Sequence, residues 1–129
     1  MEDFFIEETE TTPEINISFQ EGLFEFKGVS IPEDAEGFYS PVLDAVEAYT
    51  LTELIGNTVI AFKLVYLNTS TTAIIGKLIQ SFEGLDTEQH TTIVNWYYEE
   101  GDEDMKDIGS DFAAFSKLNF ELIPCEEIL

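Results

Sequence analysis

An α/β fold with a mixed β-sheet and three helices is what this 129-residue sequence predicts. Two observations lead to this prediction. Short apolar runs with strand character alternate along the chain with segments whose apolar residues recur at helical spacing. The chain is also 44% hydrophobic and 13% aromatic, which is enough apolar material for one globular core. We find no internal repeat and no linker, so residues 1–129 are expected to form a single domain.

The first two elements are expected to form an antiparallel hairpin. Residues 14–19 and 23–28 both alternate apolar and polar side chains, and the turn pair Glu21-Gly22 lies between them. A helix over residues 38–54 follows, with Pro41 tolerated in its first turn. Its apolar face is predicted to contain Phe38, Val42, Val46, Tyr49 and Leu54.

Residues 58–67, TVIAFKLVYL, form a nearly continuous β-branched and aromatic run, which is typical of a central strand covered on both faces. The remaining elements are a helix at 71–83, a strand at 91–98, a helix at 103–117 and a strand at 119–123. The predicted order is therefore ββαβαβαβ. The predicted core includes Phe62, Leu64, Ile75, Leu78, Ile93 and Phe112.

The charge balance excludes several classes of partner. The chain has 27 acids, five lysines and no arginine, which gives a net charge of −22. Such a field repels nucleic acids and anionic membrane surfaces, so neither is an expected partner. No apolar run is long enough to span a bilayer, and the first residues lack the basic region of an export signal. With Cys125 as the single cysteine, a reducing cytoplasm is the expected location.

The sequence also lacks the residue patterns of common catalytic and metal sites. His90 is the only histidine; it lies in the polar segment DTEQHTT and is expected to be solvated. Cys125 has no basic neighbour to activate its thiol and is expected near a frayed end of the chain. The acidic run at 99–107 fails the calcium-loop pattern, since Lys106 stands where a ligand is needed. No catalytic residue, bound metal or cofactor is expected.

The most unusual feature is a run of hydroxyl residues where a central strand meets a helix. Asn68 is followed by Thr69, Ser70, Thr71 and Thr72, at the sheet edge where open α/β folds place functional sites. One explanation is helix capping, which needs a single side-chain oxygen and is worth about 1 kcal/mol. The other is phosphorylation, because a helix N-terminus tolerates added negative charge. Composition and spacing leave both explanations open.

Several segments taken together resemble the SiaC family of bacterial regulatory phosphoproteins. They are TTPEI at 11–15, IPED at 31–34, FYSPVLDAV at 38–46, YLNTSTT at 66–72, WYYEEGDEDM at 96–105 and GSDF at 109–112. The resemblance covers almost the whole chain in order. It implies a STAS-like fold, similar to anti-sigma factor antagonists, and a non-enzymatic partner switch.

The resemblance also implies a mechanism and site residues. A kinase phosphorylates Thr69, with Ser70 as the second candidate, and a PP2C-like phosphatase removes the phosphate. The unphosphorylated form binds and activates a diguanylate cyclase, which would control cyclic-di-GMP signalling and biofilm formation. The expected partner surface consists of Asn68, Ser70, Thr71, Pro32, Glu33, Glu99 and Glu100. The alternative is an acidic decoy that occupies a basic surface of another protein.

Overall fold

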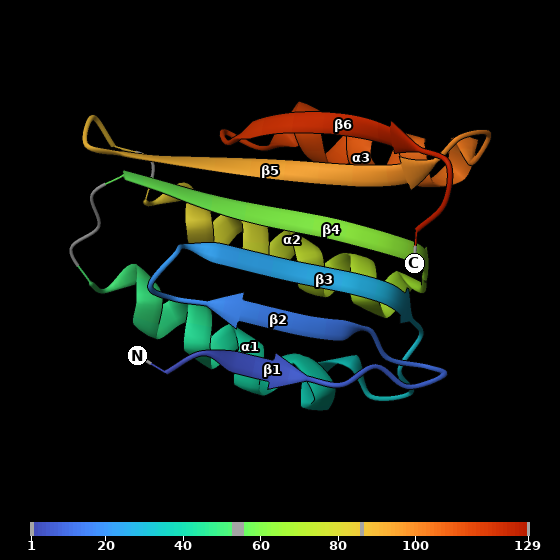
Figure 1. Ribbon diagram of the computed structural model, residues 1–129, viewed down its shortest axis with the longest axis horizontal. Helices are drawn as coiled ribbons and strands as arrows, with labels where there is room; N and C mark the ends of the chain where they lie inside the picture. The colour runs from blue at the N-terminus through green and yellow to red at the C-terminus, as the bar shows by residue number, and fades with distance from the viewer. Residues whose placement is uncertain (1, 53–55, 86, 129) are drawn as a thin grey trace.

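The computed structural model describes residues 2–52, 56–85 and 87–128, and it contains one six-stranded sheet with three helices (Figure 1). The strands are β1 (Phe4–Ile6), β2 (Glu14–Ser18), β3 (Leu23–Ser30), β4 (Gly56–Leu67), β5 (His90–Glu99) and β6 (Asn119–Cys125). The helices are α1 (Ala35–Thr50), α2 (Thr69–Glu83) and α3 (Glu103–Phe115). The predicted α/β class with a mixed sheet and three helices is confirmed.

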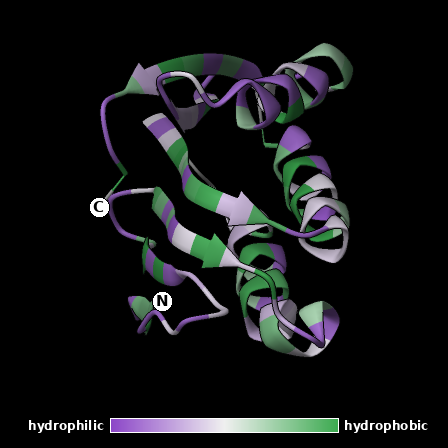
Figure 2. Ribbon diagram, turned by 90° about the vertical axis from the view of Figure 1, so that its right-hand side faces the viewer, coloured by the Kyte–Doolittle hydropathy of each residue, from purple (hydrophilic) through white to green (hydrophobic). Residues whose placement is uncertain are grey.

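The strands lie side by side in chain order, from β1 to β6. β1, β2 and β3 pair antiparallel, whereas β3, β4, β5 and β6 pair parallel. Each parallel pair needs a crossover, and the helices provide all three. The crossover connections share one handedness, and each leads to the next strand in the same direction across the sheet. Their helices therefore all lie on the same face of the sheet. Figure 2 shows this arrangement, with α1, α2 and α3 on one side and an open face on the other.

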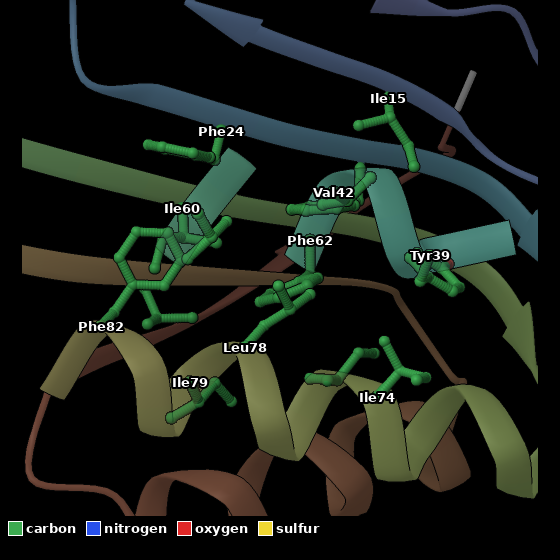
Figure 3. Close-up of a cluster of buried hydrophobic side chains, with 14 of the residues drawn as sticks. Ile15, Phe24, Tyr39, Val42, Ile60, Phe62, Ile74, Leu78, Ile79 and Phe82 are labelled. Atoms are coloured by element: carbon green, nitrogen blue, oxygen red, sulfur yellow. The ribbon is translucent and has the colours of Figure 1, made fainter. Parts of the chain in front are cut away.

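The core lies between the sheet and the helices, where side chains of β2 to β5 meet those of α1 and α2 (Figure 3). Aromatic rings fill much of it, and the Phe26 and Phe62 rings stack with their centroids 5.1 Å apart. Four predicted core residues are confirmed as buried: Phe62, Leu64, Ile75 and Leu78. Phe112 is half-buried and packs against the core, and Ile93 is half-buried on the open face.

Three features of the predicted elements were wrong. β4 is covered by helices on one face only, and Thr58, Ile60, Phe62 and Leu64 alternate along that face, although Ala61 between them is buried as well. The short edge strand β1 was missed, because a strand of three residues gives almost no periodic pattern. The first helix begins at Ala35 instead of residue 38, with Asp34 as its N-cap.

The end and the register of the first helix also differ from the prediction. α1 ends at Thr50, and the predicted terminal residue, Leu54, lies outside the described residues. At its start, Tyr39 is the fully buried residue, and Phe38 is half-buried beside it with the two ring centroids 4.8 Å apart. Val42, Val46 and Tyr49 are buried as predicted.

The prediction for His90 was wrong as well. His90 is the first residue of β5 and is only 3% exposed. Its Nδ1 lies 3.0 Å from the carbonyl oxygen of Leu85, and its Nε2 lies 2.8 Å from the Thr58 hydroxyl. Because a carbonyl only accepts, Nδ1–H donates to it, and Nε2 forms the hydrogen bond with the Thr58 hydroxyl. The Thr58 hydroxyl is also hydrogen-bonded to the Tyr49 hydroxyl at 2.7 Å, so this histidine has a structural role.

No helix in residues 2–52, 56–85 or 87–128 combines the length and apolar character that crossing a membrane requires.

Candidate functional site

The candidate site is the junction between β4 and α2, where Asn68 is held by four separate hydrogen-bonding groups. Its backbone N–H donates to the carbonyl of Ser30 at 3.0 Å, and its side-chain amide donates to the carbonyl of Pro32 at 3.2 Å. Its side-chain oxygen accepts from the Thr71 N–H at 2.9 Å, which makes Asn68 the N-cap of α2. Its carbonyl accepts from the Thr72 N–H at 3.1 Å. The first helical residue, Thr69, is therefore held in a fixed position.

A buried hydroxyl network lies beneath this junction. The Ser30 hydroxyl is 2.7 Å from the Tyr39 hydroxyl and 2.8 Å from the Thr71 hydroxyl, and Thr71 also donates to the Ser30 carbonyl at 3.1 Å. One consistent direction runs from Tyr39 to Ser30, from Ser30 to Thr71 and from Thr71 to the Ser30 carbonyl. Burial raises the pKa of Tyr39 to about 12, partly offset by its hydrogen bond to Ser30. The network links β3, α1 and α2 below Thr69.

The four hydroxyl residues of the predicted site have different environments. Thr71 is completely buried, so its hydroxyl is unavailable to a partner protein. Thr72 is half-buried, and its hydroxyl donates to the Asn68 carbonyl at 3.2 Å. Thr69 and Ser70 are exposed. The accessible hydroxyls of this run are therefore those of Thr69 and Ser70, the two phosphorylation candidates.

Ser70 faces an acidic pocket between the starts of α1 and α2. The pocket has a volume of about 340 Å³, and its lining includes Ser70, Glu33, Asp34, Glu36 and Lys77. Lys77 Nζ and Glu36 Oε1 are 3.7 Å apart, which leaves two further carboxylates beside Ser70. A phosphate on Ser70 would meet like charges there, which disfavours this position as the phosphate acceptor.

The first turn of α2 differs from those of the other two helices in the described chain. α1 carries Glu36 in its first turn, and α3 carries Glu103 and Asp104, whereas α2 carries no acid. Negative charge in a first turn is stabilising because it interacts with the helix dipole and with N–H groups that lack intrahelical partners. Although the chain is highly acidic, the start of α2 is neutral, so this helix N-terminus can accommodate an added negative charge.

The other predicted partner residues fall into two groups. Pro32 is buried and accepts from Asn68, and the exposed Glu33 lies close to Ser70. Glu99 and Glu100 instead contact the C-terminal segment: a Glu99 carboxylate oxygen accepts from the Ile128 N–H at 2.9 Å, and the Glu100 N–H donates to the Cys125 carbonyl at 2.8 Å. The structure brings Pro32 and Glu33 to the junction, while Glu99 and Glu100 hold the end of the chain.

Cys125 is the last residue of β6 and is not at a frayed end, which corrects the sequence-based expectation. It pairs with Glu99 in the parallel ladder, and Ile128 beyond it is only 9% exposed. Burial raises the pKa of the Cys125 thiol, and the nearby carboxylates of Glu99 and Glu100 raise it further. The ammonium of Lys63, a basic neighbour that the sequence did not indicate, offsets part of this rise in the pKa. A raised pKa keeps the thiol protonated and weakly nucleophilic.

Sequence reasoning missed Ser30 and Tyr39, which support the site from below. A single polar residue at the end of an apolar strand was the available signal for Ser30, and a hydroxyl on the buried face of a helix was the signal for Tyr39. Within the part of the chain that the structure describes, no group of three or more His, Cys, Asp or Glu side chains is arranged to hold a metal ion.

Comparison with known proteins agrees with this fold. An uncharacterized protein of Pseudomonas aeruginosa strain UCBPP-PA14 is 26% identical over 112 residues, which covers 87% of this chain and 88% of that protein. Apo-SiaC from Pseudomonas aeruginosa has the same fold, with a TM-score of 0.83 at 21% identity over 95% of this chain and 99% of the other. SiaC in complex with the diguanylate cyclase SiaD, which it activates, matches with a TM-score of 0.87 at 22% identity over 95% and 100% of the two chains. The model of the SiaC family regulatory phosphoproteins matches residues 6–125, and the chain therefore belongs to this family.

Proposed function

We propose that this protein is a non-enzymatic phospho-switch whose unphosphorylated form binds and activates a diguanylate cyclase in the cytoplasm. The observation that supports it best is the exposed Thr69, fixed by the Asn68 cap at the start of a helix whose first turn lacks acids. The activity attributed to the Pseudomonas aeruginosa relative in complex with its cyclase supports the choice of effector. Through this effector the protein would control cyclic-di-GMP signalling and biofilm formation.

Thr69 is the proposed phosphate acceptor. A partner kinase transfers the γ-phosphoryl group of ATP to the Thr69 hydroxyl, which loses its proton, and ADP is released. A PP2C-like phosphatase then hydrolyses the ester, which restores Thr69 and releases inorganic phosphate. Ser70 is the weaker candidate, because its pocket contains the carboxylates of Glu33 and Asp34. Thr71 and Pro32 are buried, so they support the surface from below, while Asn68, Ser70 and Glu33 contribute to it.

The phosphate acts on the partner and leaves the fold unchanged in this proposal. An internal phosphate clamp usually uses arginines, and this chain has none. Lys77 already pairs with Glu36, and Lys63 pairs with Glu25 at 3.3 Å on the sheet. At the start of α2 the helix dipole offsets the added charge, of about −1.5 to −2. A partner packed against the neutral Thr69 would instead have to desolvate a dianion, which costs several kcal/mol and abolishes binding.

A cyclase activation assay tests the proposal. Each purified diguanylate cyclase of the source organism is assayed for cyclic-di-GMP synthesis with unmodified protein, with Thr69→Ala and with Ser70→Ala as the matched control. We expect one cyclase to be activated by all three proteins. After incubation of the organism's extract with ATP, mass spectrometry should find phosphate on the unmodified protein and on Ser70→Ala but not on Thr69→Ala. Activation of no cyclase, or phosphate on Thr69→Ala at another residue of the site, would contradict the proposal.

The salt dependence of the interaction separates this function from that of an acidic decoy. A decoy held by long-range attraction loses its affinity as salt rises, because at about 1 M salt the Debye length falls to about 3 Å. A packed apolar interface keeps most of its affinity under those conditions. We expect activation of the cyclase to persist in high salt.

A further inference from the structure

An apolar groove between α2 and α3 begins one turn away from Thr69. It has a volume of about 190 Å³ and is lined by Thr72, Ile108, Asp111, Phe112 and Phe115. Thr72 follows Thr69 by three residues on α2, so the two side chains lie on the same side of the helix, one turn apart. The groove is therefore next to the proposed phosphate acceptor.

The floor of the groove is built into the fold. The Phe112 ring lies 5.6 Å from the Trp96 ring, centroid to centroid, and Trp96 is fully buried with its indole N–H donating to the Met105 carbonyl at 3.0 Å. Gly76 on α2 faces Phe112 with no side chain of its own, which leaves space between the two helices. A cavity of about 150 Å³ lined by apolar side chains is large enough to bind benzene. The groove therefore has room for one leucine-sized or aromatic side chain.

Phe115 is the feature that the fold itself does not explain. It is the last residue of α3, it lines the groove, and it is 90% exposed. The only hydroxyl of the lining, that of Thr72, already donates to the Asn68 carbonyl. The groove thus offers apolar surface with a single charged group, Asp111, and exposed aromatic surface of this kind is typical of an interaction site.

The two walls of the groove differ in charge. On α3, the exposed carboxylates of Asp104, Asp107 and Asp111 follow one another at spacings of three and four residues, beside the apolar residues of the lining. On α2, the first turn that contains Thr69 carries no acid. A matching partner therefore presents an apolar side chain to the groove, basic side chains to α3 and neutral surface to Thr69.

We propose that this groove is the effector-binding site and that it takes an amphipathic, basic helix of the effector, with one apolar side chain inserted beside Phe115. This inference rests on the proposed phospho-switch function and identifies its contact surface. The bases of the partner face α3, so none of them meets a phosphate on Thr69. Binding would then require desolvation of an unpaired dianion, and the effector helix is released. Phe115 is the anchor contributed by this chain.

A peptide titration tests the groove without any cyclase. The probe is a synthetic amphipathic helix of leucine and lysine, and the control peptide has serine in place of leucine at the same net charge. In ¹⁵N NMR spectra at about 1 M salt, where surface attraction is screened, the leucine peptide should shift the amide signals of Thr72, Ile108 and Phe115. The serine peptide should not shift them. Equal shifts with both peptides, or shifts spread over the acidic surface, would overturn the inference.

Variants then test the groove as the effector site. Phe115→Ala should weaken binding of the leucine peptide and of the activated cyclase by about tenfold or more, as expected for an interface anchor. Leu51→Ala is the matched control, because Leu51 is 83% exposed at the C-terminal end of α1. If the cyclase responds to Phe115→Ala as it does to wild type, the inference is wrong and the proposed function stands. If wild type activates no cyclase, the proposed function fails, and the peptide titration still decides whether the groove binds such a helix.

Discussion

Replacing Asn68 by alanine tests whether the junction is held as the structure shows. The change removes the acceptor of the Thr71 N–H and the donor to the Pro32 carbonyl, at 2.9 and 3.2 Å. Loss of an N-cap typically costs about 1 kcal/mol. Pro32 is buried, so leaving its carbonyl without a partner costs a further 1 to 3 kcal/mol or so. Together the two losses predict a decrease in the free energy of unfolding of about 2 to 4 kcal/mol.

Two further variants separate the contributions. Asn68→Asp keeps an acceptor for the Thr71 N–H but cannot donate to the Pro32 carbonyl, so it should recover the capping part of the loss. Thr69→Ala changes an exposed side chain next to the cap, and its free energy of unfolding should stay within about 0.5 kcal/mol of wild type. The three variants together assign the loss to Asn68 and to its individual bonds.

Urea unfolding followed by tryptophan fluorescence measures these differences. Trp96 is the only tryptophan and is fully buried, so its emission reports unfolding of the core. The midpoints should shift while the dependence on urea concentration stays the same, because all variants expose the same surface on unfolding. If Asn68→Ala is as stable as Thr69→Ala, the cap contributes nothing to stability and the role given to Asn68 is wrong.

Three other predictions concern the core. Leu64→Ala should lower the free energy of unfolding by about 2 to 5 kcal/mol in urea unfolding, since Leu64 is buried on a central strand; a loss below about 1 kcal/mol would contradict that placement. Gly109→Ala should destabilise the protein by about 1 to 3 kcal/mol, because an added Cβ would overlap the Trp96 ring. Gly76→Ala should not, because the nearest neighbouring atom would lie 3.9 Å from its Cβ. Equal melting temperatures for the two variants would be evidence against this packing. The pKa of Tyr39 is raised to about 12, so its contribution to stability is complete below pH 10 and is lost as the pH rises from 10 to 12. Between about pH 10 and pH 12, the free energy of unfolding of Tyr39→Phe should fall less than that of wild type. Identical pH profiles of the two proteins would contradict the burial of this hydroxyl.

The fold was predictable because most of its elements have strong periodic patterns. The hairpin of β2 and β3 follows from alternation around Gly22, which has a φ of 66° that favours glycine. The three helices follow from apolar residues at helical spacing. β4 was predicted as a strand, but the prediction that both of its faces are covered was wrong. Val59 and Ala61 point away from the helices and are as apolar as the residues that face them, so the sequence shows no alternation there. Which face the helices cover depends on crossover handedness, which local pattern does not contain.

The candidate site was only partly predictable. The run of hydroxyl residues identified the junction, and the resemblance to the SiaC family selected Thr69 within it. The structure adds the distinction between the exposed Thr69 and the buried Thr71. The roles of Ser30 and His90 depend on contacts with residues far away in the chain, at Thr71 and Thr58. Such contacts form only after the sheet is assembled, so a local pattern can mark Ser30 as unusual but does not reveal its partners.

The affinity of the cyclase for unmodified and Thr69-phosphorylated protein tests the central claim most directly. The phosphorylated form is made by incorporating phosphothreonine at position 69, and binding of the cyclase that the unmodified protein activates is measured by titration calorimetry. Circular dichroism of both forms serves as the control for folding. We expect matching spectra, binding by the unmodified protein and loss of binding by the phosphorylated one. Equal affinities of the two folded forms would contradict it.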